Sequence, residues 1–376
     1  MATQLNYSST AWARTLNTVM AAHIAEVELA MLRNFKMGAL LESAGRISFN
    51  SGSGFDWRFQ YRNHEVSGTT GETPRNFARR NLWLTAALQY RGYQVTDMYY
   101  YKELREASGK EALIKLTDGF VDRMEQSLKQ GLATEFYIDG EASGNTTSWH
   151  GKESMFGTNG TVNVSTGAQR SANAADPVGY ASDTYATQST ALGNNGGENE
   201  SGVVWPEGVA DPEYDCWTPL IVCYNSTYFN GSANTWAGQC DEAISYLLTH
   251  SQRNAVDNAI DTILLNRKLF WQFKARQRAK ERINVTDSLK LRSLGFKDTV
   301  EFDGCEIGLE NAIPSAVGYG FNIQNMELRS LDEQMYRVQG PVEDIDIDGY
   351  KSVVSTLSNL KHNSPRNEAK LMTIAS

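Results

Sequence analysis

The sequence predicts an α+β fold, in which helices and β-strands follow one another along 376 residues. Three observations support this fold class. Apolar residues recur at three- and four-residue steps in two long segments, which is typical of amphipathic helices. Apolar and polar residues alternate in several shorter segments, which is typical of half-buried strands. Between them lies a stretch rich in Gly, Asn, Ser and Thr, which favours loops and irregular strands.

The composition indicates a soluble globular protein. Hydrophobic residues make up 41% of the chain and charged residues 21%, and no run of about 20 apolar residues could span a membrane. The first residues lack the basic start and apolar core of a signal peptide, so we expect synthesis in a cytoplasm and no membrane contact. The net charge of −9 argues against a dedicated nucleic-acid binder, which would usually be basic.

The first elements expected are a helix and an extended hairpin. Apolar residues at helical spacing predict a helix over Thr10–Leu41, which Gly45 ends. A turn of Gly and Ser follows at Ser51–Gly54, and Phe55–Arg62 then alternates aromatic with polar residues. This alternation predicts a strand with one aromatic face. We therefore predict a long, exposed β-hairpin over Arg46–Gly71.

A strand and a second, longer helix come next. Leu82–Tyr101 alternates apolar with polar residues and predicts strand. Ser108, with Glu111 three residues later, forms a capping box, which satisfies free backbone N–H groups at a helix start. We expect this helix to end near Asp139, where Gly140 can adopt the left-handed cap. Its apolar stripe consists of Leu113, Leu116, Phe120, Met124, Leu128, Leu132 and Phe136.

The second half of the chain reads as loops followed by mixed helices and strands. Glu141–Pro212 is dominated by Gly, Asn, Ser and Thr, which predicts loop and irregular strand. Helical spacing returns over Thr235–His250 and over a longer segment, Asn254–Arg282. Strands alternate with turns over Val285–Arg329, and a last alternating strand is expected over Val353–Leu360.

The sequence contains no recognisable catalytic or metal-binding motif. It has no G-x-S-x-G, H-E-x-x-H, phosphate-binding or dinucleotide-binding pattern. Its cysteines form no C-x-x-C pair and its histidines are scattered, so we expect no enzyme, no cofactor, and buried reduced thiols. These residues are His23, His64, His150, His250 and His362, and Cys216, Cys223, Cys240 and Cys305.

Three carboxylates near the C-terminal end form a weak candidate metal site. Asp344, Asp346 and Asp348 alternate with Ile345 and Ile347. On a strand this period-two spacing places all three carboxylates on one face, where they repel one another. A divalent cation, basic groups of a neighbouring subunit or plain solvation would each compensate, and the sequence leaves all three open.

A basic segment forms the second half of the helix predicted over Asn254–Arg282. The run Arg267–Arg282 holds seven cations and one acid, Glu281. Contact with nucleic acid and a solvated helix face touching acidic groups are both compatible with this run. Its apolar residues are expected to be core or interface anchors: Leu269, Phe270, Trp271 and Phe273.

The order of elements and one stretch of sequence resemble the major capsid proteins of tailed bacteriophages, whose fold is shared with encapsulins and the herpesvirus capsid floor. The stretch is Gly295–Ile307, followed by the Ile-Pro turn at residues 313–314 and by Gly318–Asn322. Upstream, Asp261–Asn266 with Leu269 and Phe270 resembles the buried strand and short helix that precede it.

The resemblance implies a division of the chain into four regions. Residues 1–45 would form an N-terminal helical arm and residues 46–75 an extended loop. Residues 76–140 and 326–376 would form a peripheral domain. It would be built on the long helix predicted over Ser108–Asp139, which we call the spine helix. Residues 141–325 would form an axial domain, and whether it includes a loop-rich insertion stays open.

The resemblance also implies a function. The chain would be a structural protein that self-assembles through pentamers and hexamers into an icosahedral shell enclosing phage DNA, located in the virion and assembled in the host cytoplasm. A separate scaffolding protein, a portal and decoration proteins are implied partners, with DNA contacted only non-specifically. Some family members carry a scaffolding region at the N-terminus. With the hairpin expected to begin at Arg46 we expect no such region here, which implies a separate scaffolding protein or none.

The contacts between subunits are expected to be non-covalent. Some family members link a lysine on the extended loop to an asparagine on a neighbour, but no Lys occurs here between Lys36 and Lys102. Aromatic residues and Arg are the types that anchor interfaces. The expected contact residues are therefore Phe55, Trp57, Arg58, Phe59, Tyr61 and Arg62.

Two other functions remain open at this stage. An encapsulin-type nanocompartment would have the same fold and enclose an enzyme in place of DNA. A β-rich carbohydrate-binding or hydrolytic virion protein is suggested by aromatic residues in the loop-rich middle, namely Trp149, Tyr180, Tyr185 and Trp205. A hydrolase would need two carboxylates about 5–10 Å apart; Asp211, Glu213 and Asp215 are the candidates.

Overall fold

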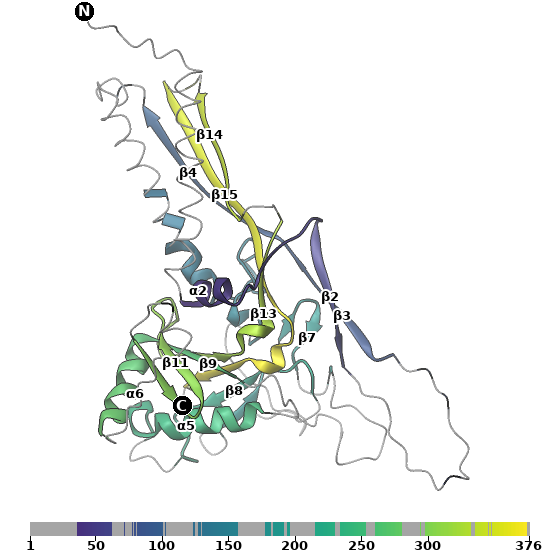
Figure 1. Cartoon of the computed structure of the whole chain (residues 1–376), viewed down its shortest axis with the longest axis vertical. Helices are drawn as coiled ribbons and strands as arrows, with labels where there is room; N and C mark the ends of the chain where they lie inside the picture. Colours follow the sequence, from purple (N-terminus) through teal and green to yellow (C-terminus); the bar gives the residue numbers. More distant parts are fainter. Residues whose placement is uncertain are drawn as a thin grey trace, which may run out of the picture.

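The computed structural model describes residues 36–61, 71, 77, 79, 81–100, 102, 123–124, 127–128, 130–156, 177–181, 183–191, 194–195, 215–229, 234–252, 260–279, 294, 298–331, 335–344, 346 and 348–373. Figure 1 shows a body from which two arms project, one made of β4, β14 and β15 and the other of β2 and β3. Within the described residues no helix is long and apolar enough to cross a membrane.

A seven-stranded mixed sheet forms the centre of the body. Its strands, in spatial order, are β10 (Thr299–Phe302), β11 (Cys305–Leu309), β9 (Thr262–Leu265), β12 (Gly318–Phe321), β16 (Ala369–Met372), β8 (Leu220–Cys223) and β5 (Val178–Tyr180). Strands β8 and β9 are buried at every position, because both faces of the sheet are covered. Helices α5 (Trp236–Ser251) and α6 (Arg267–Ala279) share one apolar cluster with one face.

A strand and a helix, β9 and α6, occupy the segment for which helical spacing predicted one long helix. A single helix over Asn254–Arg282 is wrong, because Thr262–Leu265 pairs with β11 and β12 as a central strand. The buried strand and short helix expected from the family resemblance are both present. Asn266 separates them, and its Oδ1 accepts a hydrogen bond from the backbone N–H of Lys268 at 3.1 Å, a side-chain cap at the helix start.

A five-stranded sheet carries the first arm. Strand β15 (Gly349–His362) pairs along ten residues with β4 (Arg91–Tyr100). On its other edge β15 pairs first with β14 (Arg337–Asp344) and then, nearer the body, with β13 (Met326–Ser330). One continuous strand therefore runs from the end of this arm into the body.

The predicted hairpin over Arg46–Gly71 is wrong in its pairing. Strand β1 (Ile47–Phe49) pairs in parallel with β13 in the five-stranded sheet. Strand β2 (Gly54–Gln60) pairs instead with β3 (Trp83–Gln89), more than twenty residues further along. The two halves of the expected hairpin thus belong to different sheets, because a turn at Ser51–Gly54 redirects the chain without folding it back on β1.

Two helices are described in part. Helix α2 (Lys36–Ser43) ends before Gly45, whose φ of +64° is the left-handed conformation expected of a terminator; residues 1–35 lie outside the described part. In the predicted spine helix, residues 123–124, 127–128 and 130–135 are helical. Its described stripe residues Met124, Leu128, Leu132 and Phe136 are all buried, whereas the capping box at residues 108–111 lies outside the description.

Gly140 corrects the expected end of that helix. Its φ is not positive, so it does not form the left-handed cap. A Cβ at this position would lie 2.4 Å from the carbonyl oxygen of Trp149. Glycine is required here because two backbone segments approach closely.

Strand β16 also changes the expected domain division. The resemblance assigned residues 326–376 to the peripheral domain, but β16 lies between β12 and β8 in the seven-stranded sheet. The last part of the chain therefore belongs to both sheets. The remaining short elements are η1 (Lys152–Met155), β6 (Thr184–Tyr185), β7 (Gln188–Ser189), η2 (Ile323–Asn325) and η3 (Pro365–Asn367).

Candidate functional site

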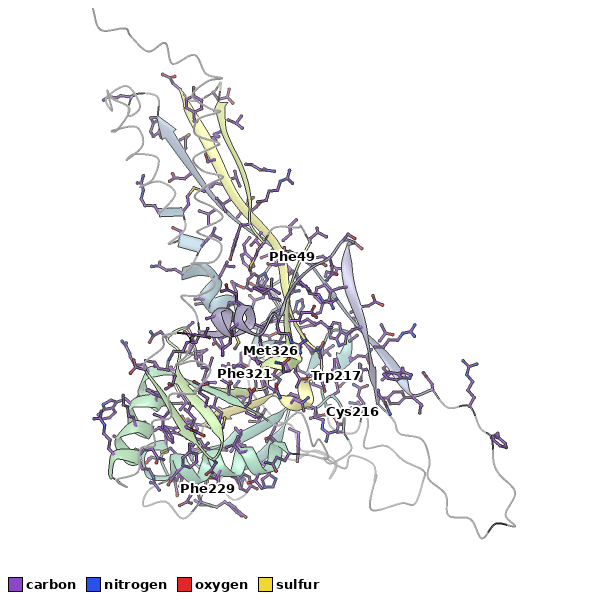
Figure 2. All side chains as sticks on the ribbon, in the orientation of Figure 1. Phe49, Cys216, Trp217, Phe229, Phe321 and Met326 are labelled. Atoms are coloured by element: carbon purple, nitrogen blue, oxygen red, sulfur yellow. The ribbon has the colours of Figure 1, made fainter. Side chains whose placement is uncertain are left out.

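The aromatic face of β2 packs against the subunit's own core. Phe55 and Phe59 are only 7% and 8% exposed, and Phe59 stacks on Trp217 with ring centroids 4.0 Å apart. The indole N–H of Trp57 donates a hydrogen bond to the carbonyl oxygen of Asn363 at 3.1 Å. Figure 2 shows Trp217 where the β2–β3 arm meets the body. The alternation is confirmed. Their own chain covers Phe55 and Phe59, which leaves little of either ring for a neighbouring subunit, so their expected intersubunit contact stays a prediction.

The opposite face of this arm is polar and solvent-exposed. Arg58 lies on it, between the two buried phenylalanines in sequence, and Trp83 is 51% exposed. An open pocket of about 670 Å³ is lined by Arg58, Arg79, Asn81, Leu82, Trp83 and Thr85. Of the other expected contact residues, Trp57 and Tyr61 are half-buried, and Arg62 lies outside the described residues. Among the expected contact residues that the structure describes, Arg58 is thus the one that is exposed to solvent.

The end of the other arm is acidic. Strand β14 ends at Asp344, which pairs with Gly349 of β15, and Asp346 and Asp348 are exposed turn residues. The expected strand bearing three carboxylates on one face is therefore wrong, because the chain reverses there. Within the described residues no group of three His, Cys, Asp or Glu side chains could hold a metal ion; the side chain of Asp344 lies outside that description, so a cation there stays a prediction.

A buried polar network, not foreseen from the sequence, lies where the two sheets meet. Lys152 and Glu368 form an ion pair, with side chains 0% and 1% exposed. The ammonium group also lies 4.2 Å from the ring centroid of Phe321 and 2.9 Å from the sulfur of Met326. Figure 2 shows Phe321 and Met326 close together at this junction. Burial lowers the pKa of Lys152 to about 8, and the nearby carboxylate of Glu368 only partly offsets this effect.

Two histidines belong to the same network. His362 Nδ1 lies 3.1 Å from Glu368 Oε1, and its backbone N–H donates to the hydroxyl oxygen of Tyr185 at 2.9 Å. Burial lowers the pKa of His362 below its ordinary value, and Lys152 adds to this effect. Histidine distribution along the sequence gave no sign of this arrangement, because His150 and His362 are more than two hundred residues apart.

Asn359 determines which ring nitrogen of neutral His150 carries the proton. Its amide oxygen accepts from the backbone N–H of His150 at 2.9 Å. Its amide nitrogen donates to the carbonyl oxygen of Gln89 and contacts His150 Nδ1, each at 2.7 Å. Since an amide nitrogen only donates, Nδ1 must accept, and neutral His150 carries its proton on Nε2, 3.6 Å from Glu141. Burial, followed by the charge of Arg91, lowers the pKa of His150 to about 4.

This network is suited to holding structure rather than to chemistry on a substrate. Its members come from η1 and the loop before it, from β6, from β15 and from the link to β16. The network therefore joins the five-stranded sheet to the seven-stranded one. Neither of its histidines is accessible to solvent, since His150 is 3% and His362 0% exposed.

The described residues that suggested a carbohydrate-active protein are buried in the subunit. Trp149, Tyr180 and Tyr185 are buried. Asp215 is fully buried, and its Oδ1 accepts hydrogen bonds from the backbone N–H groups of Trp217 and Thr218 at 2.9 and 2.7 Å. Such a carboxylate shapes a turn and faces no cleft. Trp205, Asp211 and Glu213 lie outside the described residues.

The four cysteines form no disulfide. Cys223, Cys240 and Cys305 are buried and Cys216 is half-buried, all as free thiols. Burial raises the pKa of Cys216, and it raises the pKa of Cys240 to about 12, which disfavours the reactive thiolate. The expected burial is confirmed for Cys223, Cys240 and Cys305 but not for Cys216.

Comparison with known proteins decides the fold. No protein-family model matches the sequence, and no curated protein matches it. Solved structures do match. The capsid asymmetric unit of cyanophage A-1(L) has a TM-score of 0.56 and 13% identity, covering 90% of this chain and 92% of that chain. This chain has the tailed-phage capsid fold. The capsid of the native GTA particle agrees, with a TM-score of 0.50, 11% identity and 90% coverage of both chains.

The tailed-phage capsid fold confirms the fold class expected from the sequence. The likeness extends over nine-tenths of the chain, so it is not confined to one local motif. At these identities the likeness concerns the backbone arrangement. The capsid fold is thus reached here with a largely different set of side chains.

Proposed function

We propose that this chain is a structural subunit that self-assembles, through pentamers and hexamers, into an icosahedral shell around phage DNA. The observation that carries this proposal is the capsid fold over nearly the whole chain. The subunit would act by non-covalent association, not catalysis, and would reside in the virion after assembly in the host cytoplasm. A separate scaffolding protein, a portal and decoration proteins are the further partners expected.

The two arms are the surfaces that we assign to contacts between subunits. An exposed arm adds area beyond the subunit's own core and is stable only if its inner face is buried, as Phe59 on Trp217 is. Its outer face offers Arg58, Arg79 and half-exposed Trp83, residue types that anchor interfaces. The other arm ends in Asp346 and Asp348, both exposed.

These two surfaces are complementary in charge. We therefore place the acidic end of one subunit against the basic pocket of another. Heterologous contacts of this kind, repeated around a symmetry axis, close into rings. Opposite charges also favour this pairing over contact between two like ends. The same pairing compensates the repulsion among the carboxylates at the acidic end without a metal ion.

A charge exchange tests this contact. Reversing Arg58 and Arg79 to Asp should prevent ring and shell formation in negative-stain micrographs, while circular dichroism of the subunit stays unchanged. Adding Asp346→Arg and Asp348→Arg to the same chain should restore assembly. Reversal of Arg337, which is exposed on β14, is the matched control and should assemble normally. Normal shells from the Arg58/Arg79 variant would refute the contact.

The shell function itself is tested on the unaltered chain, alone and with its scaffolding partner. Rings and particles of several megadaltons are expected by mass photometry and electron microscopy. A monomer under every condition would overturn the proposal. The contents of purified particles separate the two shell functions, because a phage capsid yields DNA and an encapsulin-type compartment yields an enzyme.

A further inference from the structure

Helix α6 presents two chemically different sides. Leu269, Phe270 and Phe273 are 3%, 4% and 0% exposed and pack into the apolar cluster of the seven-stranded sheet. On the opposite side Trp271 is 68% exposed. An indole left in solvent has no role in the subunit's own core, so of the core or interface anchors expected on this helix three are core residues and Trp271 is not.

Two of the cations on α6 are used within the subunit. Arg276 Nε lies 2.6 Å from Asp241 of α5, and Lys274 lies 3.7 Å from Asp298. These pairs fit the interpretation of the basic run as a helix face touching acidic groups. They attach the C-terminal half of α6 to its neighbours.

The other cations on α6 are unpaired. Arg267, Lys268 and Arg278 are exposed, and within the part of the chain that the structure describes none has an acidic partner. Arg267 and Lys268 precede Trp271 by four and three residues, about one helical turn. Arg278 follows Trp271 by seven residues, about two turns, so all three lie on the same side of the helix as Trp271. We call Arg267, Lys268, Trp271 and Arg278 the α6 patch.

The charge of the surrounding sequence points in the same direction. Residues 267–297 contain ten Lys and Arg against two acids, Glu281 and Asp287, whereas the whole chain carries a net charge of −9. The remainder of the subunit is therefore strongly acidic. A local concentration of cations in an acidic protein indicates an anionic partner.

The enclosed DNA is the anionic partner that the proposed shell requires. A subunit with an acidic inner surface would repel densely packed phosphates, so some cationic surface must face the interior. Unpaired Arg and Lys bind phosphates, and a neighbouring exposed indole adds stacking and van der Waals contact. No base-reading geometry is needed for such binding.

We propose that the α6 patch faces the interior of the shell and binds the phosphate backbone of the enclosed DNA without sequence preference. This inference rests on the proposed shell function and assigns the side of the subunit that DNA contacts. It also assigns Trp271 a role distinct from that of its three buried neighbours.

Charge reversal on exposed positions tests the inference without disturbing the core. The variant Arg267→Glu, Lys268→Glu, Arg278→Glu is compared with the unaltered subunit for binding of a 20-base-pair duplex, by fluorescence anisotropy over a range of salt concentrations. We expect at least about a tenfold loss of affinity at low salt, and a slope of log K against log salt shallower by ~2.7 for three lost phosphate contacts. Trp271→Ala should weaken binding with no change in slope.

A matched control separates the patch from general charge effects. Lys102→Glu, Arg123→Glu, Arg337→Glu also reverses three exposed cations and should bind DNA as the unaltered subunit does, apart from a small uniform loss. Equal losses in both variants would overturn the α6 assignment. Unchanged DNA binding with failed assembly in the α6 variant would also overturn it, and would show that a second subunit covers the patch.

Assembled particles give an independent readout. Particles of the α6 variant should form with normal dimensions and contain less DNA, measured by the ratio of absorbance at 260 and 280 nm. Ultraviolet cross-linking of filled unaltered particles should recover DNA on the peptide that contains Trp271, and recovery only on other peptides would refute the inference. Failure of the unaltered chain to form shells would count against the proposed function, whereas duplex binding by the free subunit is measured independently of it.

Discussion

The ammonium group of Lys152 and the carboxylate of Glu368 are in direct contact, although both side chains are withdrawn from solvent. They are 216 residues apart in the sequence, one in η1 and the other in the residue before β16. A buried ion pair contributes little net stability, because desolvation offsets the attraction. Its removal on one side alone is costly, since an unpaired charge then stays buried.

Lys152→Met should therefore destabilise the subunit by about 3–5 kcal/mol, measured from the urea midpoint of the unassembled subunit. Methionine replaces most of the apolar volume and leaves Glu368 without its cation. The double variant Lys152→Met, Glu368→Leu removes both charges and should recover a large part of that loss. Equal stability of the single variant and the unaltered protein would contradict the ion-pair geometry.

Acidification should weaken the subunit through His150. Its pKa is about 4 in the folded chain against about 6.5 when unfolded, so between these pH values the unfolded chain binds a proton that the folded chain does not. The free energy of unfolding therefore falls as pH drops from 6.5 to 4, by at most about 3 kcal/mol for this group, and no further below pH 4.

Comparison with His150→Gln isolates this contribution. Glutamine retains a hydrogen-bonding group beside Asn359 but does not titrate. The difference in unfolding free energy between the two proteins should change over pH 6.5–4 and be constant above that window. A parallel pH dependence in both proteins would show that other groups, such as His362, account for the slope.

Trp217→Ala should destabilise the subunit by about 3–5 kcal/mol, since the ring is fully buried and its loss leaves a large cavity. The change also removes the stacking partner of Phe59, so the β2–β3 arm should become more sensitive to limited proteolysis. Trp271→Ala is the matched control, because that indole is mainly in solvent and its loss should change stability by about 0.5 kcal/mol or less. Similar costs for both tryptophans would contradict the packing described.

Gly140→Ala should cost about 1–3 kcal/mol, because the new methyl group would overlap the carbonyl oxygen of Trp149 and two backbone segments would have to move apart. Gly131→Ala is the control, since nothing lies within 4 Å of a Cβ there and the residue is helical. That change should stabilise the subunit by about 0.5–1 kcal/mol. Thermal unfolding of the two variants compares them directly, and a neutral Gly140→Ala would refute the close approach.

The elements that could be predicted from the sequence are those defined by local pattern. Alternation identified β2 and β15, and helical spacing identified α5 and the spine helix, because side-chain period follows directly from backbone geometry. The partners of these elements were not local. β1 and β2 are four residues apart, yet they enter different sheets, and their pairing depends on strands about 30 and 280 residues further along the chain.

The candidate sites show the same limit. Arg58 faces outward because it is a polar residue within an alternating aromatic strand. The burial of Phe59 could not be foreseen, because its partner, Trp217, follows a loop-rich stretch without periodicity. Lys152, His150 and Glu368 gave no local signal, since a buried charge is recognised only when its counter-ion is located.

Strand β15 gives the subunit a mechanical property. Its 14 residues extend over roughly 46 Å, from beside Asp348 to His362, which touches Glu368. A strand hydrogen-bonded on both edges is stiff along its length, so it acts as a lever whose short end lies in the charged junction. In the proposed shell, a force that a neighbouring subunit applies at the acidic end would be carried along β15 to His362, whose ring contacts Glu368, the partner of Lys152.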